Sequence, residues 1–286
     1  MSLPGTEKRN CYTTDDLQRK MKVSLIVATY NNPEFLYLTL KSVMNQRRLP
    51  DEIVVADDGS GEDTRRLVEE MATESFVPLH HIWHPDEGFR LGAIRNRAIA
   101  AAEGDYIIQI DGDIVLHPSF IADHVAMARE GWFYSGSRVL LSSATTEKML
   151  TREIVELPED APERKSGKCR RIPWLMRMMR RYKSGDGGYV RGCNMAFWRK
   201  DLLNVNGYNE DIQGWGREDS ELSYRLINSG KKKGFVKFGG IEYHLYHKEN
   251  SKENDARNIA MMERASKSGL TKVPNGICKP VDADVK

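Results

Sequence analysis

KVSLIVAT at positions 22–29 is a short run of mostly apolar, β-branched residues, the pattern of a strand buried on both faces. Pro33 follows shortly after, at a position where a helix can start, and the apolar residues from Glu34 to Gln46 have helical spacing. The sequence therefore predicts a domain that opens with a buried strand followed directly by a helix.

The same alternation of strand and helix continues to about residue 113. Further strands are predicted at Glu52–Ala56, His80–Trp83 and Tyr106–Ile110, and further helices at Glu62–Ala72 and Leu91–Ala102. Such alternation predicts an α/β fold with a mostly parallel central sheet and helices on both faces. Ligands of these sheets bind at the carboxyl ends of the strands. Three polar clusters fall at such ends: Thr29–Asn32, Asp57–Asp58 and Asp111–Asp113.

Composition narrows the class of protein. The 286 residues are 40% hydrophobic and 29% charged, which is typical of a soluble globular chain with a substantial core. No apolar run approaches the roughly 20 residues that a membrane-spanning helix needs. Four scattered cysteines without a CxxC pair favour reduced thiols in a cytosolic protein over disulfides or a zinc knuckle.

Beyond about residue 140 the alternation fades. A strand is predicted at Tyr189–Trp198, a helix that stops at Gly230, two short strands within Gly234–Tyr246, and a surface helix at Asn254–Ser266.

Acidic residues follow two of the predicted strands. Asp111 and Asp113 flank Gly112, whose small size lets the backbone approach closely, and two carboxylates at this spacing can converge on a hard divalent cation. Asp58 could accept a hydrogen bond from the imide N–H of a nucleotide base. Ordinary turn chemistry remains the alternative for both clusters.

Other candidates lie on helices and near the last strand. A guanidinium such as that of Arg95 can bind phosphate or stack on a base, although it can also be a solvated helix residue. Trp215 lies between two glycines, and Asp219 opens a helix whose dipole would hold it ionised, as a base requires. His244, and with weaker support His247, could complete a metal site.

The ordered motifs resemble a known family. VSLIVATYNNPEFLYLTLKSV (23–43) followed by EIVVADDGSGEDT (52–64) is similar to the opening of family 2 glycosyltransferases of the GT-A fold. RGCNMAFWRKDLLNVNGYNEDIQGWGREDSELSYRL (191–226) resembles the acceptor-side region of the β-1,4-galactosyltransferases and of bacterial chondroitin and hyaluronan polymerases. The resemblance extends over roughly residues 22–248.

That resemblance implies roles on the donor side. Asp58 would contact uracil, with Tyr30 and Ala28 beside it, and Arg95 would lie near the nucleotide. Asp111 would face both the ribose and the metal.

On the metal and acceptor side, Asp113 and His244 would ligate Mn²⁺ or Mg²⁺. Trp215 and Glu218 would hold the acceptor, and Asp219 would be the catalytic base. Where related sequences commonly have Gly-Trp-Gly-Gly-Glu-Asp, Arg217 replaces the second glycine in this chain.

The resemblance also implies an organisation of the chain. We divide it into a polar N-terminal tail (1–21), a nucleotide-sugar-binding half (22–115), an acceptor-binding and catalytic half (116–250) and a C-terminal helix and tail (251–286).

The predicted activity is transfer of a hexose or N-acetylhexosamine from a UDP-sugar to a hydroxyl of a glycan or lipid-linked glycan, with inversion at the anomeric carbon. The expected setting is bacterial surface polysaccharide or lipopolysaccharide synthesis. The alternatives are a non-catalytic sugar-nucleotide-binding protein and a sugar-nucleotide pyrophosphorylase. The latter would want a glycine-rich phosphate loop after the first strand, where this chain has Thr29–Asn32.

The segment Arg164–Lys183 stands apart because it is rich in Arg and Lys, contains no acidic residue and is interleaved with Trp and Met. One interpretation is a surface helix that contacts anionic lipid, and the other is a mobile basic loop over the active site. Nucleic-acid binding is poorly supported. We expect a cytoplasmic protein with peripheral contact to the inner face of the membrane.

Overall fold

The computed structural model describes residues 21–248 and 255–279. The tail predicted at 1–21 therefore lies outside the described residues except for Met21. The surface helix predicted at Asn254–Ser266 corresponds to α10 (Asp255–Ser268), apart from Asn254, which also lies outside them.

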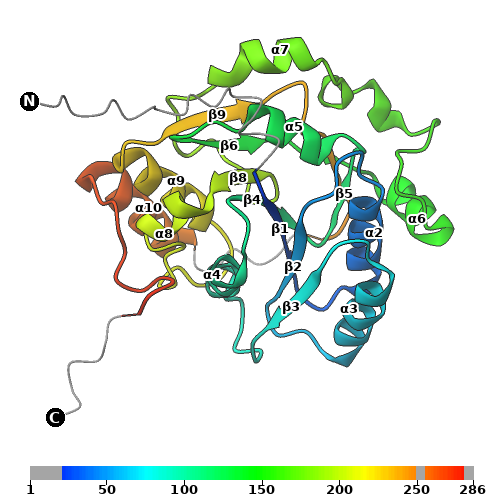
Figure 1. Cartoon of the computed structure of the whole chain (residues 1–286), viewed down its shortest axis with the longest axis horizontal. Helices are drawn as coiled ribbons and strands as arrows, with labels where there is room; N and C mark the ends of the chain where they lie inside the picture. The colour runs from blue at the N-terminus through cyan, green and yellow to red at the C-terminus, as the bar shows by residue number, and fades with distance from the viewer. Residues whose placement is uncertain (1–20, 249–254, 280–286) are drawn as a thin grey trace, which may run out of the picture.

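A seven-stranded sheet forms the centre of the molecule, in the order β3-β2-β1-β4-β8-β6-β9 (Figure 1). The four strands predicted from the alternation are parallel to one another. β8 is antiparallel to both of its neighbours, so the sheet is mixed on that side. The seven strands are β1 (Val23–Thr29), β2 (Glu52–Asp57), β3 (Leu79–Trp83), β4 (Tyr106–Asp111), β6 (Trp132–Gly136), β8 (Met195–Trp198) and β9 (Lys232–Val236).

β8 is shorter than the predicted strand Tyr189–Trp198. The backbone N–H of Asn194 donates to the carbonyl of Arg191 at 2.9 Å, which makes a turn immediately before the strand. Residues 189–194 therefore do not extend the sheet. The turn instead carries Gly192 toward the carboxyl edge of the parallel strands, where it contacts a site residue described below.

Helices cover both faces of the sheet, as predicted (Figure 1). Leu25 and Val27 of β1 share a core with α2, α3 and α5, whereas Ile26 and Ala28 share another with α4, α8 and α9. These alternate side chains are all buried, because a strand covered on both sides buries both of its faces. The helices are α2 (Pro33–Met44), α3 (Glu62–Glu74), α4 (Leu91–Ala101), α5 (Phe120–Met127), α8 (Arg199–Asn204) and α9 (Glu218–Asn228).

A second sheet of three short strands, in the order β5-β10-β7, lies beside the first. It brings the chain just after β4 next to the chain near residue 244, because His244 pairs with Ile114 in the antiparallel ladder of β10 and β5. Its strands are β5 (Ile114–Leu116), β7 (Val139–Leu140) and β10 (Glu242–His244). The helix α6 (Ser143–Arg152) follows β7.

The two predicted halves, 22–115 and 116–250, share the large sheet. β4 from the first half pairs with β8 from the second, from Tyr106 opposite Trp198 to Gln109 opposite Met195. The boundary is therefore one of proposed role within a common sheet, and the assignment of those roles stays a prediction.

Candidate functional site

The carboxyl ends of the parallel strands lie side by side. Asp57 is opposite Thr29 across β1 and β2, and Asp111 is opposite Ala28 across β1 and β4. The ladder continues one residue further, where the N–H of Gly112 donates to the carbonyl of Ala28 at 2.7 Å. A Cβ at Gly112 would lie about 3.0 Å from the Thr29 hydroxyl, so the close approach favours glycine.

Arg95 connects the end of β4 with the start of α9. Its side chain is 1% exposed and lies on α4, yet it contacts residues far apart in the chain. Its Nη2 donates to Asp111 at 2.7 Å and its Nη1 to Asp219 at 3.1 Å, and Nη1 is 3.7 Å from Glu218. A buried guanidinium thus holds the end of β4 against the start of α9.

Two further residues fix the position of Asp219. The Tyr208 hydroxyl donates to its Oδ1 at 3.0 Å. Gly192 approaches the other oxygen so closely that a Cβ there would lie 2.0 Å from Oδ2. The Asp219 side chain remains 17% exposed, so a carboxylate in a defined orientation still reaches the surface of the site.

Two of the carboxylates near Arg95 have raised pKa values. Burial raises the pKa of Asp111 to about 6 and that of Glu218 to about 7, although Arg95 acts in the opposite direction on both. Oε2 of Glu218 accepts no hydrogen bond from the residues that the structure describes. At neutral pH Glu218 is therefore partly protonated and has an oxygen left to bind a ligand.

A candidate metal centre adjoins this network. Ligand atoms of Asp113, His244 and His247 all lie within 4.8 Å of one another. The Asp113 Oδ2 is 2.9 Å from Nε2 of His247 and 3.5 Å from Nε2 of His244. Burial lowers the pKa of His244, whereas the hydrogen bond that His247 donates to Asp113 raises the pKa of His247.

These residues fit a divalent metal ion. Oδ1 of Asp113 is buried and finds no partner in the described part of the chain, which leaves it available as a ligand. Two imidazoles with one carboxylate suit a transition-metal ion such as Mn²⁺ better than Mg²⁺, which prefers oxygen ligands in near-ideal octahedral geometry.

The structure separates the two carboxylates of the Asp-Gly-Asp motif. Asp113 joins the histidines, whereas Asp111 accepts from Arg95 and is absent from the metal-ligand cluster. Asp111 as a metal ligand stays a prediction. His247, the less favoured histidine in the sequence, lies closer to Asp113 than His244 does, and its place near the last strand was the signal for considering it.

The predicted nucleotide-binding residues lie at the ends of β1 and β2. Asp58 is buried, and its two oxygens contact His84 Nε2 at 2.6 Å and the Arg90 backbone N–H at 2.9 Å. Burial raises its pKa. Ala28 is buried too, whereas Tyr30 is 48% exposed and donates to Asp86 at 2.9 Å. Tyr30 therefore presents a ring to a ligand more directly than Asp58 presents its carboxylate.

The role of Arg95 near a nucleotide stays a prediction. Its guanidinium is almost fully buried, and protein carboxylates occupy both terminal nitrogens. No residue pattern in the sequence indicated that Arg95, Asp111 and Asp219 would meet, because they are separated by up to 124 positions. Tyr208 and Gly192 were missed for the same reason.

Trp215, predicted to bind the acceptor, is 40% exposed in the loop before α9. Three residues of this loop have left-handed backbone conformations: Gly214 (φ 76°), Gly216 (φ 102°) and Arg217 (φ 80°). Arg217 thus adopts a conformation that favours the glycine common at this position in related sequences. Its Nε donates to Asp255 of α10 at 3.0 Å.

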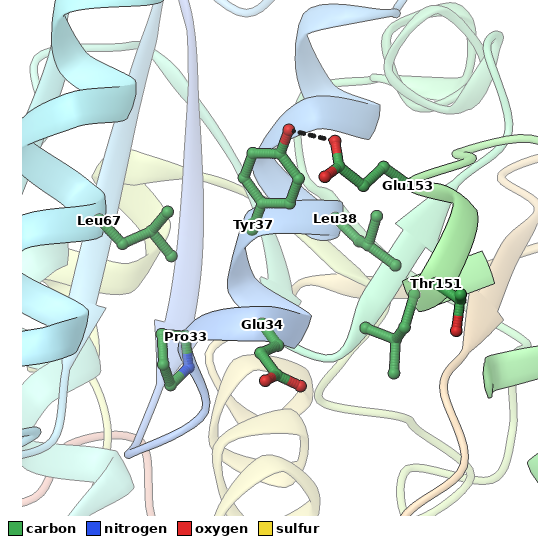
Figure 2. A pocket seen from close by; sticks show the side chains of 8 residues that line it. Pro33, Glu34, Tyr37, Leu38, Leu67, Thr151 and Glu153 are labelled. Carbon is green, nitrogen blue, oxygen red and sulfur yellow. Dashed lines mark hydrogen bonds between the residues drawn. The ribbon is translucent and has the colours of Figure 1, made fainter. Parts of the chain in front are cut away.

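A separate groove of about 490 Å³ lies between α2, α3 and α6 (Figure 2). Across it, the Tyr37 hydroxyl donates to Glu153 at 2.8 Å. None of the predicted site residues lines it; the lining residues are Pro33, Glu34, Tyr37, Leu38, Leu67, Leu150, Thr151 and Glu153. The groove is not part of the candidate site.

Carboxylates and a histidine pair at the carboxyl edge of a mostly parallel sheet define an α/β protein that binds its ligand at that edge. Comparison with known proteins gives the family. The model of glycosyl transferase family 2 matches residues 24–204, and a model described as the N-terminal domain of galactosyltransferase matches residues 180–248. The chain belongs to glycosyl transferase family 2.

Curated relatives include long bacterial synthases. The chain is 28% identical to the chondroitin synthase of Escherichia coli over 86% of this chain and 38% of that protein. It is 27% identical to the hyaluronan synthase of Pasteurella multocida over 82% of this chain and 25% of that protein. It therefore spans well under half the length of these relatives.

Solved structures share the fold. The structure of S. aureus TarS 1-349 has a TM-score of 0.60 at 18% identity and covers 86% of this chain and 65% of that one. A mannosyltransferase from Pyrobaculum calidifontis, in complex with GDP-Man and Mn²⁺, has a TM-score of 0.58 at 17% identity, with 85% and 63% covered. Both likenesses support the GT-A fold predicted from the sequence.

Proposed function

We propose that this chain transfers a hexose or N-acetylhexosamine from a UDP-sugar to an acceptor hydroxyl, with inversion at the anomeric carbon. One observation carries the proposal. Arg95 holds Asp111, at the end of a sheet strand, within one ion-pair network with Asp219, and Asp113 of the adjoining metal-ligand cluster lies two residues beyond Asp111. This arrangement supports a proposed base, Asp219, near a proposed cation site at the carboxyl edge of the sheet.

The relatives support the donor and the acceptor classes. Solved complexes of TarS contain UDP and UDP-GlcNAc. The chondroitin and hyaluronan synthases point to a glycan product, and we extend this to synthesis of a bacterial surface polysaccharide or lipopolysaccharide. The acceptor would be a glycan or a lipid-linked glycan. The setting would be cytoplasmic, with peripheral contact to the inner face of the membrane.

In the proposed reaction Asp219 accepts the proton of the acceptor hydroxyl. The oxygen then attacks the anomeric carbon from the face opposite UDP, and the bond from that carbon to the diphosphate oxygen breaks. UDP leaves with the bonding electron pair, so an α-linked donor gives a β-linked product. Arg95 and Tyr208 keep Asp219 oriented for this transfer, because both donate to the same oxygen, Oδ1.

Asp113, His244 and His247 would hold the metal ion, Mn²⁺ or Mg²⁺. When bound, the ion neutralises charge on the diphosphate. Asp111 would face the ribose and metal side while its other contact, with Arg95, fixes it. The donor set favours Mn²⁺ of the two ions.

The remaining predicted residues would bind the two substrates. Tyr30 and Asp58, with Ala28 beside them, would receive the uracil. Trp215 would stack on a face of the acceptor sugar, and Glu218 would bind an acceptor hydroxyl through the oxygen that has no partner among the described residues.

The test is UDP release by the purified protein over a panel of UDP-sugars, with Mn²⁺ and with chelator. We expect release from one donor only, and only with metal present. The Asp219→Asn variant should lose transfer while binding UDP nearly as well as the parent, since the amide keeps the shape but cannot take the proton.

Three outcomes would decide against the proposal. Full transfer by Asp219→Asn would remove the assigned base. UDP binding without release from any donor, over a range of acceptors, would favour a non-catalytic sugar-nucleotide-binding protein. Release of pyrophosphate from a sugar phosphate and a nucleoside triphosphate would favour a pyrophosphorylase.

A further inference from the structure

The basic segment Arg164–Lys183 is not the single surface helix that one interpretation of the sequence predicted. It forms short pieces: η1 (Pro162–Lys165), η2 (Gly167–Cys169), α7 (Pro173–Met178) and η3 (Met179–Arg181). Pro173 explains the break before α7, because a proline disfavours helical backbone in the preceding residue, and Ile172 is extended with φ −137° and ψ 90°.

The segment is fastened to the body of the protein at several points. Arg171 makes a bidentate ion pair with the buried Asp123, with contacts of 2.7 to 3.1 Å. The Ile172 N–H donates to the carbonyl of Phe238 at 2.8 Å, and Met176 is buried. The Arg180 guanidinium lies 6.0 Å from the centre of the Trp132 ring. These contacts argue against the alternative of a mobile loop.

The exposed side chains of the segment include both apolar and cationic ones. Trp174 is 65% exposed and Met178 is 71% exposed, and their spacing of four residues puts them on one face of α7. Arg170, Arg177 and Arg181 are exposed around them and form no ion pair with any residue that the structure describes. We call these five side chains the 170–181 surface.

We infer that the 170–181 surface binds the headgroup region of a membrane containing anionic phospholipids. Nine Lys and Arg residues without an acidic one in Arg164–Lys183 give a local positive charge, although the net charge of the chain is only +2. Anionic lipid attracts such clusters, and a Trp ring beside a thioether can enter the interface while the arginines stay at the phosphates.

The pairing of charge with exposed apolar area separates this partner from a soluble polyanion. A sulfated or carboxylated glycan would pair with the arginines and could stack on Trp174, but it would leave Met178 in water. A partner with an apolar layer beneath its negative surface accounts for the arginines and for both exposed apolar side chains. Among the described residues, no helix has the length and apolar composition that crossing a bilayer demands.

The 170–181 surface is connected through the chain to the strand that carries His244, as an enzyme acting on a membrane-bound acceptor would need. Next to it along the chain, the Lys168 ammonium donates to the carbonyl of Arg138 at 3.2 Å, between β6 and β7. β7 pairs with β10, the strand that carries His244. The inference itself does not depend on the proposed activity, because lipid binding is measured without substrate.

The experiment is co-sedimentation of the full chain with vesicles of phosphatidylcholine alone and of equal parts phosphatidylcholine and phosphatidylglycerol. We expect binding to the mixed vesicles only. Replacing Arg170, Arg177 and Arg181 by Gln should weaken it on the order of a hundredfold, since each basic side chain near such a surface contributes roughly a factor of five. Trp174→Ala with Met178→Ala should weaken it about tenfold or more.

Matched controls lie elsewhere on the surface. Gln at Arg97, Arg257 and Arg264 removes the same charge from exposed positions on α4 and α10, and Phe76→Ala removes an apolar side chain that is 82% exposed. Both controls should bind the mixed vesicles like the parent. Lipids with brominated acyl chains should quench fluorescence of the parent more than that of Trp174→Phe.

The inference is overturned by binding to phosphatidylcholine alone at equal strength, or by equal losses in the two triple-Gln variants. It is also overturned if Trp174→Ala with Met178→Ala binds as well as the parent while soluble heparin removes the protein from the vesicles, since that result identifies a polyanion site. Melting temperatures of the variants should match the parent, because all replaced side chains are exposed.

Discussion

The Glu218→Gln variant should be more stable than the parent at pH 8, and about as stable as the parent at pH 4.5. The side chain is 10% exposed and its nearest cationic atom, Nη1 of Arg95, is 3.7 Å away. Burial raises its pKa from 4.5 to about 7. Between these values the folded chain holds a proton that the unfolded chain has released, so stability falls as the pH rises through this window. The shift corresponds to on the order of 3 kcal/mol, and Gln, which stays neutral, avoids that loss.

The assay is urea unfolding of parent and Glu218→Gln at steps from pH 4.5 to 8, with chelator present so that metal binding does not contribute. The difference in unfolding free energy should be small at pH 4.5 and should reach up to about 3 kcal/mol in favour of the variant at pH 8. Glu221→Gln is the matched control on the same helix. Glu221 is buried in a bidentate pair with Arg225, so its replacement should destabilise the protein at pH 8 by about 1–3 kcal/mol.

A difference that does not change with pH, or a Glu218→Gln variant less stable than the parent at pH 8, would refute the reasoning. The gain in stability should come with a loss of function. If Glu218 binds the acceptor, the variant should have a higher KM for acceptor and an almost unchanged KM for donor. Such a loss is expected where a buried, destabilising carboxylate is retained because it binds a substrate.

Other perturbations test the remaining parts of the site. Arg95→Met should destabilise the protein by about 3–5 kcal/mol in thermal or urea unfolding and abolish transfer, because it leaves buried carboxylates without their cation. A variant that keeps its stability would contradict the view that Arg95 stabilises the protein by pairing with Asp111 and Asp219. His244→Ala and His247→Ala should each lower Mn²⁺ affinity on the order of tenfold or more in calorimetry, and equal affinity in either would remove that histidine from the metal site. Gly192→Ala should reduce transfer but not Mn²⁺ binding, because its Cβ would meet Oδ2 of Asp219 at 2.0 Å and overpacking costs about 1–3 kcal/mol. Unchanged transfer would mean that Asp219 does not need its present orientation.

The parts of the fold that could be predicted are those that depend on local patterns. The buried runs at Val23–Thr29, Glu52–Asp57 and Tyr106–Asp111 are continuous and rich in β-branched residues, and a strand covered on both faces needs just that composition. The reversed direction of β8 could not be predicted, because no local pattern encodes which way a strand enters a sheet. The turn at Arg191–Asn194 shortens that strand, and it likewise depends on tertiary contacts rather than on the local sequence.

The site shows the same division. Candidate residues could be found one by one from residue type and from their place after strands. Their partners could not, since Asp111 meets Arg95 and Asp113 meets His247 only through pairing of elements distant in sequence. Asp111 and Asp113, separated by one residue, therefore belong to different networks. The structure adds this separation of the two carboxylates, whereas their identity could be found from the sequence.

The loop that carries Trp215 and the proposed base Asp219 are restrained by different parts of the molecule. The loop that carries Trp215 is held from α10, because the Asn258 amide donates to the carbonyls of Gln213 and Gly216, both at 3.1 Å. The left-handed backbone conformation of Arg217 costs roughly 1–2 kcal/mol, and the contact of its side chain with α10 offsets part of that cost. Asp219, the second residue of α9, is instead held by Arg95 of α4 and by Tyr208. We therefore expect a change in the loop on binding an acceptor to leave Asp219, the proposed base, in place.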